Sequence, residues 1–160
     1  MAGGLYLNVY GVLHGLAGTT LALANVYGPR QDPNGEAGVV AIFAGLLLSG
    51  RPCTVFGTGE QIRDFVYVAD VADALLAAAE RADGQLFNIG TGVGTSVNDL
   101  YRTMAAIVGG PDDPERGSAR PGELDRSVLD ATRAAGQLGW RPVTGLDDGL
   151  QATLDWFSDR

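Results

Sequence analysis

The amino-acid sequence predicts an α/β fold in a single unit, residues 1–160. Strand-like segments alternate with helical segments along the whole chain, with no internal repeat and no low-complexity tract. The chain has 160 residues, of which 46% are hydrophobic and 19% charged. That length is enough for one hydrophobic core, and that composition is too apolar for a disordered chain.

The first helices and the strand between them are strongly apolar. Residues 1–16 carry leucine and valine at helical spacing, begin without an N-cap and are apolar on nearly every side, so we expect this helix to be buried on more than one face. Residues 19–26 suit a strand covered on both faces, which a Gly/Pro-rich loop from Gly28 closes. Residues 38–49 predict a second apolar helix.

Two short strands follow, at residues 54–56 and 65–67, and the glycine-containing turn between them predicts a β-hairpin. Residues 70–82 form an alanine-rich amphipathic pattern that predicts a helix. Asp70 and Asp73 fall in its first turn, where carboxylates suit the helix dipole. We therefore interpret these two residues as helix caps rather than as a metal-binding pair.

The second half of the chain predicts one strand and three helices. Residues 86–89 predict the strand, and Ser96 with Asp99 resembles a capping box that opens a helix ending at Val108. Residues 109–118 read as an acidic, Gly/Pro-rich loop. Two short helices complete the chain, at residues 131–138 and 146–158.

Charge and residue counts exclude several functions. The net charge of -8 would repel a phosphate backbone or an anionic membrane surface, so we expect no nucleic-acid partner and no membrane partner. All eleven basic residues are arginine, so the chain offers no Schiff-base lysine, P-loop lysine or Tyr-x-x-x-Lys relay. One cysteine and one histidine cannot form a disulfide framework or a zinc cluster, which fits a reducing cytoplasm. We expect Cys53 to be a small strand hydrophobe and His14 to be a packed or surface residue.

A glycine-rich turn, Gly90-Thr-Gly-Val-Gly94, lies between a predicted strand and a predicted helix. A turn in that setting can hold a dinucleotide pyrophosphate. Here the spacing departs from G-x-G-x-x-G because Thr95 occupies the last glycine position, and no acidic residue follows at the required distance. We interpret the segment as a tight strand-to-helix turn.

A few residues could form a binding site. Arg63 and Arg120 could clamp a diphosphate from separate loops, although each could equally pair with a nearby carboxylate. The Pro-Gly turn after Arg120 could bring Glu123 close to it. Phe56 could be a core residue or could stack on a base. Asn25 lies in an apolar strand and, if buried, needs partners from the backbone or from a ligand.

Five motifs follow one another along the chain. They are Ala-Asn-Val-Tyr-Gly-Pro-Arg-Gln (24–31), Gly-Glu-Ala-Gly-Val-Val-Ala-Ile-Phe (35–43), Arg-Asp-Phe-Val-Tyr-Val-Ala-Asp-Val-Ala (63–72), Phe-Asn-Ile-Gly-Thr-Gly (87–92) and Arg-Pro-Gly-Glu (120–123). In this order they resemble the C-terminal half of the extended short-chain dehydrogenase/reductase family, and among its members most closely the UDP-glucose 4-epimerases and related NAD-dependent sugar-nucleotide epimerases. The resemblance covers essentially the whole chain and implies part of a Rossmann-like fold, with a few parallel strands and a small α/β substrate-binding region.

The resemblance implies a role for each matching residue. Asn25 would contact the diphosphate of a sugar nucleotide, and Val26 would line the nicotinamide side. Val39 would offer backbone contacts to the nucleotide, and Val55 with Phe56 would form the uracil site. The phosphates and the ribose would be bound by the remaining three residues, Arg63 and Arg120 for the phosphates and Glu123 for the ribose.

The family's catalytic residues have no counterpart in this sequence. The glycine-rich NAD motif, the catalytic Ser/Thr and Tyr-x-x-x-Lys of the family precede the region that matches, so we expect the N-terminal dinucleotide-binding domain to be absent from this chain. Tyr6, Tyr10 and Tyr67 cannot replace the catalytic tyrosine, because no lysine is present to lower a phenol pKa. Gly4 and Ala22 also stand where relatives commonly have glutamate and arginine. We expect the chain alone to be inactive and to bind no NAD, the cofactor of the full-length family.

The resemblance also predicts partners. The expected ligand is a UDP-sugar or another sugar nucleotide. In the family the strand at 19–26 pairs with the missing half and the first helix joins in dimerisation, so both would be exposed here and favour a homo-oligomer or association with an N-terminal half. Three alternatives remain open: a noncatalytic nucleotide-sugar-binding module, a structural half that assembles with a separate chain, and part of a sugar-nucleotide 4,6-dehydratase or decarboxylase. The sequence also leaves undecided which sugar and which base the expected sugar nucleotide carries.

Overall fold

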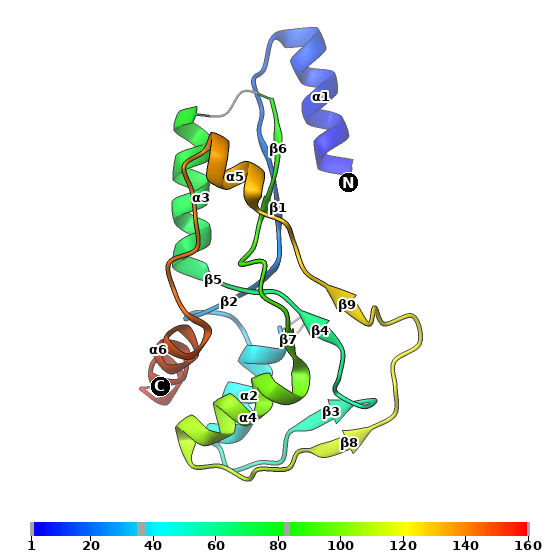
Figure 1. The fold of residues 1–160 in the computed structure, drawn as a ribbon, viewed down its shortest axis with the longest axis vertical. Helices are drawn as coiled ribbons and strands as arrows, with labels where there is room; N and C mark the ends of the chain where they lie inside the picture. Colours follow the sequence, from blue (N-terminus) through cyan, green and yellow to red (C-terminus); the bar gives the residue numbers. More distant parts are fainter. Residues whose placement is uncertain (1, 35–37, 82–83, 160) are drawn as a thin grey trace.

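The computed structural model describes residues 2–34, 38–81 and 84–159. The molecule is elongated, with one packed region around β1 and β6 and a second around α2, α4 and α6 (Figure 1). Helix α1 (Ala2–His14) stands at one end of the molecule, beside the first region (Figure 1). The start of the second family motif, residues 35–37, lies outside the described residues.

The first packed region is built on a parallel strand pair. Strand β1 (Thr20–Leu23) pairs with β6 (Leu86–Ile89), and helices α3 (Val68–Arg81) and α5 (Thr132–Gln137) pack nearby. The apolar face of α3 contributes three residues to the core, in agreement with its amphipathic sequence. The buried core residues are Val66, Val71, Ala74, Ala78, Phe87, Ile89, Ala134, Leu138 and Trp140.

The second packed region is a group of three helices. Helices α2 (Val39–Leu48), α4 (Val97–Val108) and α6 (Leu146–Ser158) contact one another pairwise. Phe43 of α2 and Tyr101 of α4 meet edge to face, with ring centroids 5.6 Å apart. The largest buried side chains of this core are Phe43, Tyr101, Leu100, Met104, Leu150, Leu154, Val40 and Val55.

Short strand pairs join the two regions. They are β2 (Asn25–Tyr27) with β5 (Phe65–Tyr67) in parallel, β3 (Thr54–Phe56) with β8 (Glu115–Gly117) in parallel, and β4 (Ile62–Arg63) with β7 (Thr95–Ser96) antiparallel and with β9 (Arg126–Ser127) in parallel. The α/β class with parallel strands is therefore confirmed.

The strand predicted at residues 19–26 is present but divided. Ala24 separates β1 from β2, and the two parts pair with different strands. The Ala24 amide donates to the Ile89 carbonyl at 2.9 Å, and the next amide, that of Asn25, donates to Asp64 at 2.9 Å. The hydrogen-bond partner of the backbone thus changes from β6 to the residue before β5 between Ala24 and Asn25. The hydrophobic pattern of residues 19–26 does not indicate this change of partner.

The predicted hairpin is wrong. Strand β3 pairs with β8 from much later in the chain, and β5 pairs with β2. Gly57 and Gly59 adopt positive φ angles of 65° and 76°, so the backbone turns away from β3 instead of folding back along it. Gly59 then accepts a hydrogen bond from the Asn98 amide at 3.0 Å, which holds the turn against α4.

The prediction for Asp70 and Asp73 is confirmed in part. Asp70 lies in the first turn of α3, whereas Asp73 lies beyond that turn. The Asp70 carboxylate does not cap the helix but bonds to the segment before α6. Asp70 is only 2% exposed, and its carboxylate accepts hydrogen bonds from the amides of Val143 and Thr144 at 3.3 and 3.0 Å and from the Thr144 hydroxyl at 3.1 Å. Asp70 therefore connects α3 to the segment before α6.

The capping box of α4 is confirmed. The Ser96 hydroxyl accepts from the Asp99 amide at 3.0 Å and donates to the Asp99 carboxylate at 2.7 Å. The predicted loop at 109–118 is partly wrong, because β8 occupies three of its residues. Those residues pair with β3, and their own composition gives little strand signal.

Helix α1 exposes most of its apolar side chains. The exposed fraction is 67% at Leu5, 68% at Tyr6, 88% at Val12 and 68% at Leu13. The burial predicted from composition is therefore wrong for this chain, whereas the exposure that follows from the family resemblance is confirmed. Strand β1 pairs with β6 alone among the described strands, so its other edge is open. Among the described helices, none has the length and apolar character needed to cross a bilayer.

Candidate functional site

One cavity of about 400 Å³ lies between β2, the start of α2, β3 and the turn at residues 120–123. Its size falls within the usual range for small-ligand sites. Every residue assigned to a site from the sequence and the resemblance lines it: Asn25, Val26, Val39, Val55, Phe56, Arg63, Arg120 and Glu123. The structure thus brings together residues that are spread over most of the chain.

The N-terminus of α2 forms one wall of the cavity. Gly38, Val39 and Val40 line this wall, and the N-cap residue Gly38 provides no side-chain hydrogen bond to the first turn. The first amides of a helix lack intrahelical acceptors and carry the positive end of the helix dipole. This wall therefore suits an electronegative ligand group, such as a carbonyl or a phosphate oxygen.

Asn25 and Val26 line the cavity from β2. Asn25 is exposed, and its side-chain amide has no hydrogen-bond partner among the described residues. Its strand position is fixed by the backbone bond to Asp64, so the side chain is held at the cavity while its polar atoms stay available. Such an amide can both donate to and accept from a ligand.

Val55 and Phe56 form an apolar wall at the end of β3. Val55 is buried, whereas Phe56 is 37% exposed and faces the cavity. The guanidinium of Arg120 lies over the Phe56 ring, 4.1 Å from its centroid. A Cβ atom at Gly117 would come within 2.8 Å of the ring, so a glycine there leaves room for Phe56. Phe56 is therefore a partly open aromatic surface rather than a core residue.

Arg63 and Glu123 form an ion pair at the edge of the cavity. The Nη2 atom of Arg63 lies 3.2 Å from Glu123 Oε1, and Nη1 donates to the Leu124 carbonyl at 2.7 Å. Of the two partners that the sequence allowed for Arg63, a ligand phosphate or a protein carboxylate, this structure shows the carboxylate, that of Glu123. Arg120 has no carboxylate partner among the described residues. The Glu123 amide donates to the Arg120 carbonyl at 3.3 Å, which confirms the predicted turn.

The glycine-rich turn at 90–94 is occupied by a protein carboxylate. Asp64 is 1% exposed and accepts from the amides of Thr91 and Gly92 at 2.9 and 3.1 Å, and from the Thr91 hydroxyl at 2.6 Å. These amides are therefore not free to hold a pyrophosphate, and the interpretation as a structural turn is confirmed. The amides of Thr91 and Gly92 therefore form no open cradle for the pyrophosphate of NAD.

Sequence reasoning missed Asp64 and Gln31. The signal for Asp64 was a carboxylate directly before the apolar residues of β5, where burial demands hydrogen-bond donors. Gln31 lines the cavity, and its buried side-chain oxygen has no hydrogen-bond partner among the described residues. Gln31 is thus a further polar group available to a ligand.

Burial affects the pKa of Tyr27 and of Cys53 in this part of the fold. Burial raises the pKa of Tyr27 well above its ordinary value, and the Tyr27 hydroxyl donates to the Leu146 carbonyl at 3.3 Å. Burial also raises the pKa of Cys53, which is 1% exposed and behaves as the small hydrophobe that the sequence predicts. His14 is exposed, contacts Tyr10 and does not line the cavity.

Comparisons with known proteins agree on one family. The sequence profile of the NAD dependent epimerase/dehydratase family matches residues 1–90. A UDP-glucose 4-epimerase from Mycolicibacterium smegmatis is 50% identical over 161 aligned residues, which cover 100% of this chain and 51% of that protein. A putative UDP-glucose 4-epimerase from Methanocaldococcus jannaschii is 40% identical and is matched over 50% of its length.

Solved structures give the same result. A UDP-glucose 4-epimerase from Thermotoga maritima, crystallised with UDP-glucose, superposes with a TM-score of 0.96 at 46% identity, over 99% of this chain and 51% of that one. A UDP-glucose 4-epimerase from Thermus thermophilus in complex with NAD has a TM-score of 0.88 at 42% identity and is covered over 51% of its length. The chain thus spans about half the length of the relatives it matches.

Proposed function

Because the chain belongs to the NAD dependent epimerase/dehydratase family, we propose that residues 1–160 act as one unit that forms the sugar-nucleotide-binding half of an epimerase site. The observation that carries the proposal is the single cavity that all eight expected residues line. The names of the most similar relatives, UDP-glucose 4-epimerases, support a UDP-sugar as the ligand.

The walls of the cavity match the parts of a nucleoside diphosphate. Phe56 offers an aromatic surface to a planar base, and Arg63 and Arg120 offer two guanidinium groups to phosphate oxygens. The start of α2 adds backbone amides, and Asn25 adds a free side-chain amide. In this arrangement Glu123 has two possible roles. It separates from Arg63 when the ligand binds, or it stays paired with Arg63 and accepts a hydrogen bond from a ribose hydroxyl.

Epimerisation would need a second half of the site. The sequence has no lysine for the family's proton relay, and at the glycine-rich turn the amides of Thr91 and Gly92 bond to Asp64 instead of being open to a dinucleotide. We therefore propose that NAD binding and 4-epimerisation require a dinucleotide-binding half, and that Val26 would face the nicotinamide in that assembly. The open edge of β1 and the bare face of α1 support such a partner.

The decisive experiment is a calorimetric titration of the 160-residue chain with UDP, with NAD titrated in parallel, together with the variant Arg63→Ala. We expect UDP to bind, NAD not to bind, and the variant to bind UDP about tenfold or more weakly, because it loses charge-assisted hydrogen bonds. Arg102→Ala removes an arginine outside the cavity and is the matched control.

Three outcomes would contradict the proposal. Absence of UDP binding would show that the cavity is not a nucleotide site in this chain. Equal UDP affinity of wild type and Arg63→Ala would remove Arg63 from the site. Measurable interconversion of UDP-glucose and UDP-galactose by the pure chain would contradict the need for a second half.

A further inference from the structure

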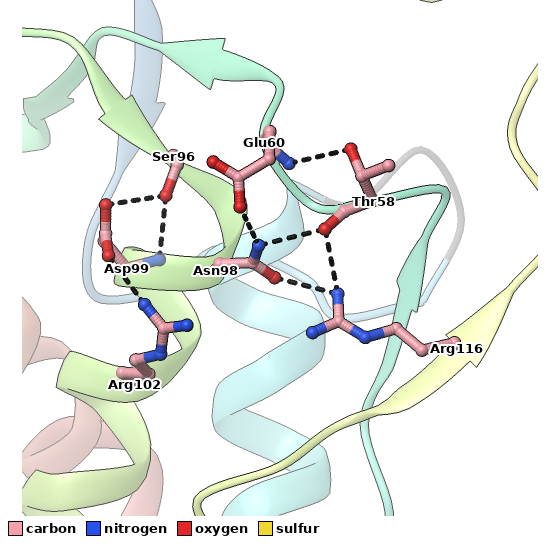
Figure 2. Close-up of polar contacts among 7 residues, drawn as sticks. All are labelled: Thr58, Glu60, Ser96, Asn98, Asp99, Arg102 and Arg116. Atoms are coloured by element: carbon pink, nitrogen blue, oxygen red, sulfur yellow. Dashed lines mark hydrogen bonds and ion pairs between the residues drawn. The ribbon is translucent and has the colours of Figure 1, made fainter.

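A polar cluster around the buried Asn98 lies just outside the cavity, at the turn that connects β3 to β4 (Figure 2). Asn98 is 5% exposed, and its Nδ2 atom donates to the Thr58 carbonyl at 2.9 Å and to Glu60 Oε1 at 2.6 Å. Arg116 reaches it from β8, and Arg116 Nη1 donates to Asn98 Oδ1 at 2.9 Å and to the Thr58 carbonyl at 3.1 Å. No residue of this cluster lines the cavity.

The position of this cluster in the fold is specific. Phe56 ends the strand before the turn, and Arg63 ends the strand after it. The turn residues are tied to α4, since the Asn98 amide donates to the Gly59 carbonyl at 3.0 Å and the Val97 amide donates to the Gln61 carbonyl at 3.2 Å. The side chain of Gln61 also donates to the Phe56 carbonyl at 3.2 Å. The conformation of the turn therefore sets the separation of Phe56 and Arg63.

Gly59 limits which side chain can occupy the position of Asn98. Its φ angle is 76°, and a Cβ atom there would collide with the Asn98 side chain. The asparagine thus fits directly against the turn backbone, so few other side chains can take its place. An amide is needed there, because Asn98 donates to one carboxylate and accepts from one guanidinium at the same time.

We infer that Asn98, held between Glu60 and Arg116, is a positioning residue that fixes the distance between the aromatic base wall at Phe56 and the phosphate-binding Arg63. This inference rests on the proposed function of the cavity. It predicts that the cluster matters most for ligands that contact both subsites at once. A ligand that contacts only the arginines, such as inorganic pyrophosphate, depends on it much less.

The test uses a reversal of hydrogen-bond polarity. In Asn98→Asp, a carboxylate replaces the Nδ2 donor beside Glu60, so two carboxylates face each other and the turn is displaced. In the double variant Asn98→Asp/Glu60→Gln, the new amide at position 60 can donate to the new carboxylate, which still accepts from Arg116. Arg102→Ala, one turn along α4 from Asn98, is the control, because the Arg102–Asp99 ion pair is exposed.

Binding of UDP and of pyrophosphate is measured by calorimetry for each variant. We expect Asn98→Asp to weaken UDP about tenfold while pyrophosphate changes less than about twofold, and the double variant to recover most of the UDP affinity. The control should bind both ligands like wild type. An unchanged UDP affinity, an equal loss for both ligands, or no recovery in the double variant would overturn the inference.

A second variant and a ligand-free measurement complete the design. Arg116→Gln removes the guanidinium from an exposed strand residue without adding charge to the core, so this variant tests the cluster even if Asn98→Asp does not fold. Amide hydrogen exchange at residues 57–61 is then followed without ligand. Faster exchange in both Asn98→Asp and Arg116→Gln supports the inference, and unchanged exchange overturns it. If wild type binds no UDP, the proposed function fails while the exchange result still decides what the cluster does.

Discussion

The guanidinium of Arg120 stacks on the ring of Phe56, with 4.1 Å between its central carbon and the ring centroid. The two residues come from β3 and from the turn after β8, and both line the cavity. A planar ligand group that stacks on Phe56 must therefore share the ring with Arg120 or displace it. The positively charged guanidinium of Arg120 is the type of group that binds phosphate oxygens.

The first prediction concerns that charge. Arg120→Ala should weaken UDP binding about tenfold or more, because a charge-assisted contact to phosphate is lost. Folding stability should change little, since Arg120 is exposed and has no ion-pair partner among the described residues. Calorimetry at low and high salt checks both points, and the loss should shrink as salt screens the charge. Equal affinity of variant and wild type would contradict the prediction.

The second prediction concerns Asp64, which holds the turn after β6. Asp64→Asn should lower the free energy of unfolding by about 2–3 kcal/mol, because a buried carboxylate that accepts from several donors is replaced by an amide that also donates. Urea denaturation measures the loss. Asp73→Asn is the matched control: Asp73 is exposed on α3, and its replacement should change stability by less than about 0.5 kcal/mol. A similar loss in both variants would refute the assignment.

The third prediction concerns the start of α4. Ser96→Ala removes the hydroxyl that accepts from the Asp99 amide, and it should cost about 1 kcal/mol of folding stability. Ser158→Ala provides the comparison, because that hydroxyl lies at the exposed end of α6, where its loss should have a smaller effect. Thermal unfolding of the two variants side by side decides between them. A smaller loss for Ser96→Ala than for Ser158→Ala would count against the cap.

The fourth prediction concerns alkaline pH. Burial, the nearby Tyr67 and the carboxylates around it raise the pKa of Tyr27, so the folded phenol keeps its proton at a pH where the unfolded phenol has lost it. Unfolding then releases a proton, and stability falls as pH rises above about 10. In Tyr27→Phe the decline between about pH 10 and 11 should be less steep, as urea titrations can measure. An identical slope would show that folding does not raise the pKa of Tyr27.

The fifth prediction concerns the apolar surface of α1. We expect the chain to self-associate, since many adjacent apolar side chains of this helix are exposed. Leu13→Lys should shift the sedimentation profile toward smaller species. Leu76→Lys makes the same change at an equally exposed leucine of α3 and should leave the profile unchanged. A monomeric wild-type chain, or equal shifts in the two variants, would be the contrary result.

Local sequence signals predicted the helices well and the strand pairing poorly. The capping box at Ser96 and the apolar residues of α2 each lie within one short stretch of the sequence, so both can be recognised without knowledge of the fold. The pairing of β3 with β8 depends on residues far apart in the chain, and neither strand is long enough to show its partner. The hairpin prediction failed for this reason.

The site residues show the same division. Residue type alone left Arg63 and Arg120 undecided between a ligand and a carboxylate, and only the order of the family motifs favoured the ligand. The structure then gave each arginine a different partner, Glu123 for Arg63 and the Phe56 ring for Arg120. Asp64 and Asp70 could not be assigned in advance, because the amides they accept from lie far along the chain.

The pairing of β1 with β6 also bears on how the chain acquires its structure. Thr20 lies opposite Leu86, and Thr54 lies opposite Glu115, so both parallel pairs close long loops. Contacts of this kind form slowly, because the entropy of loop closure must be overcome before they contribute stability. During synthesis the helices can form early, but the cavity cannot close until the residues around Arg120 have left the ribosome. Nascent chains that stop before that point should therefore be unable to bind nucleotide, however well their helices are formed.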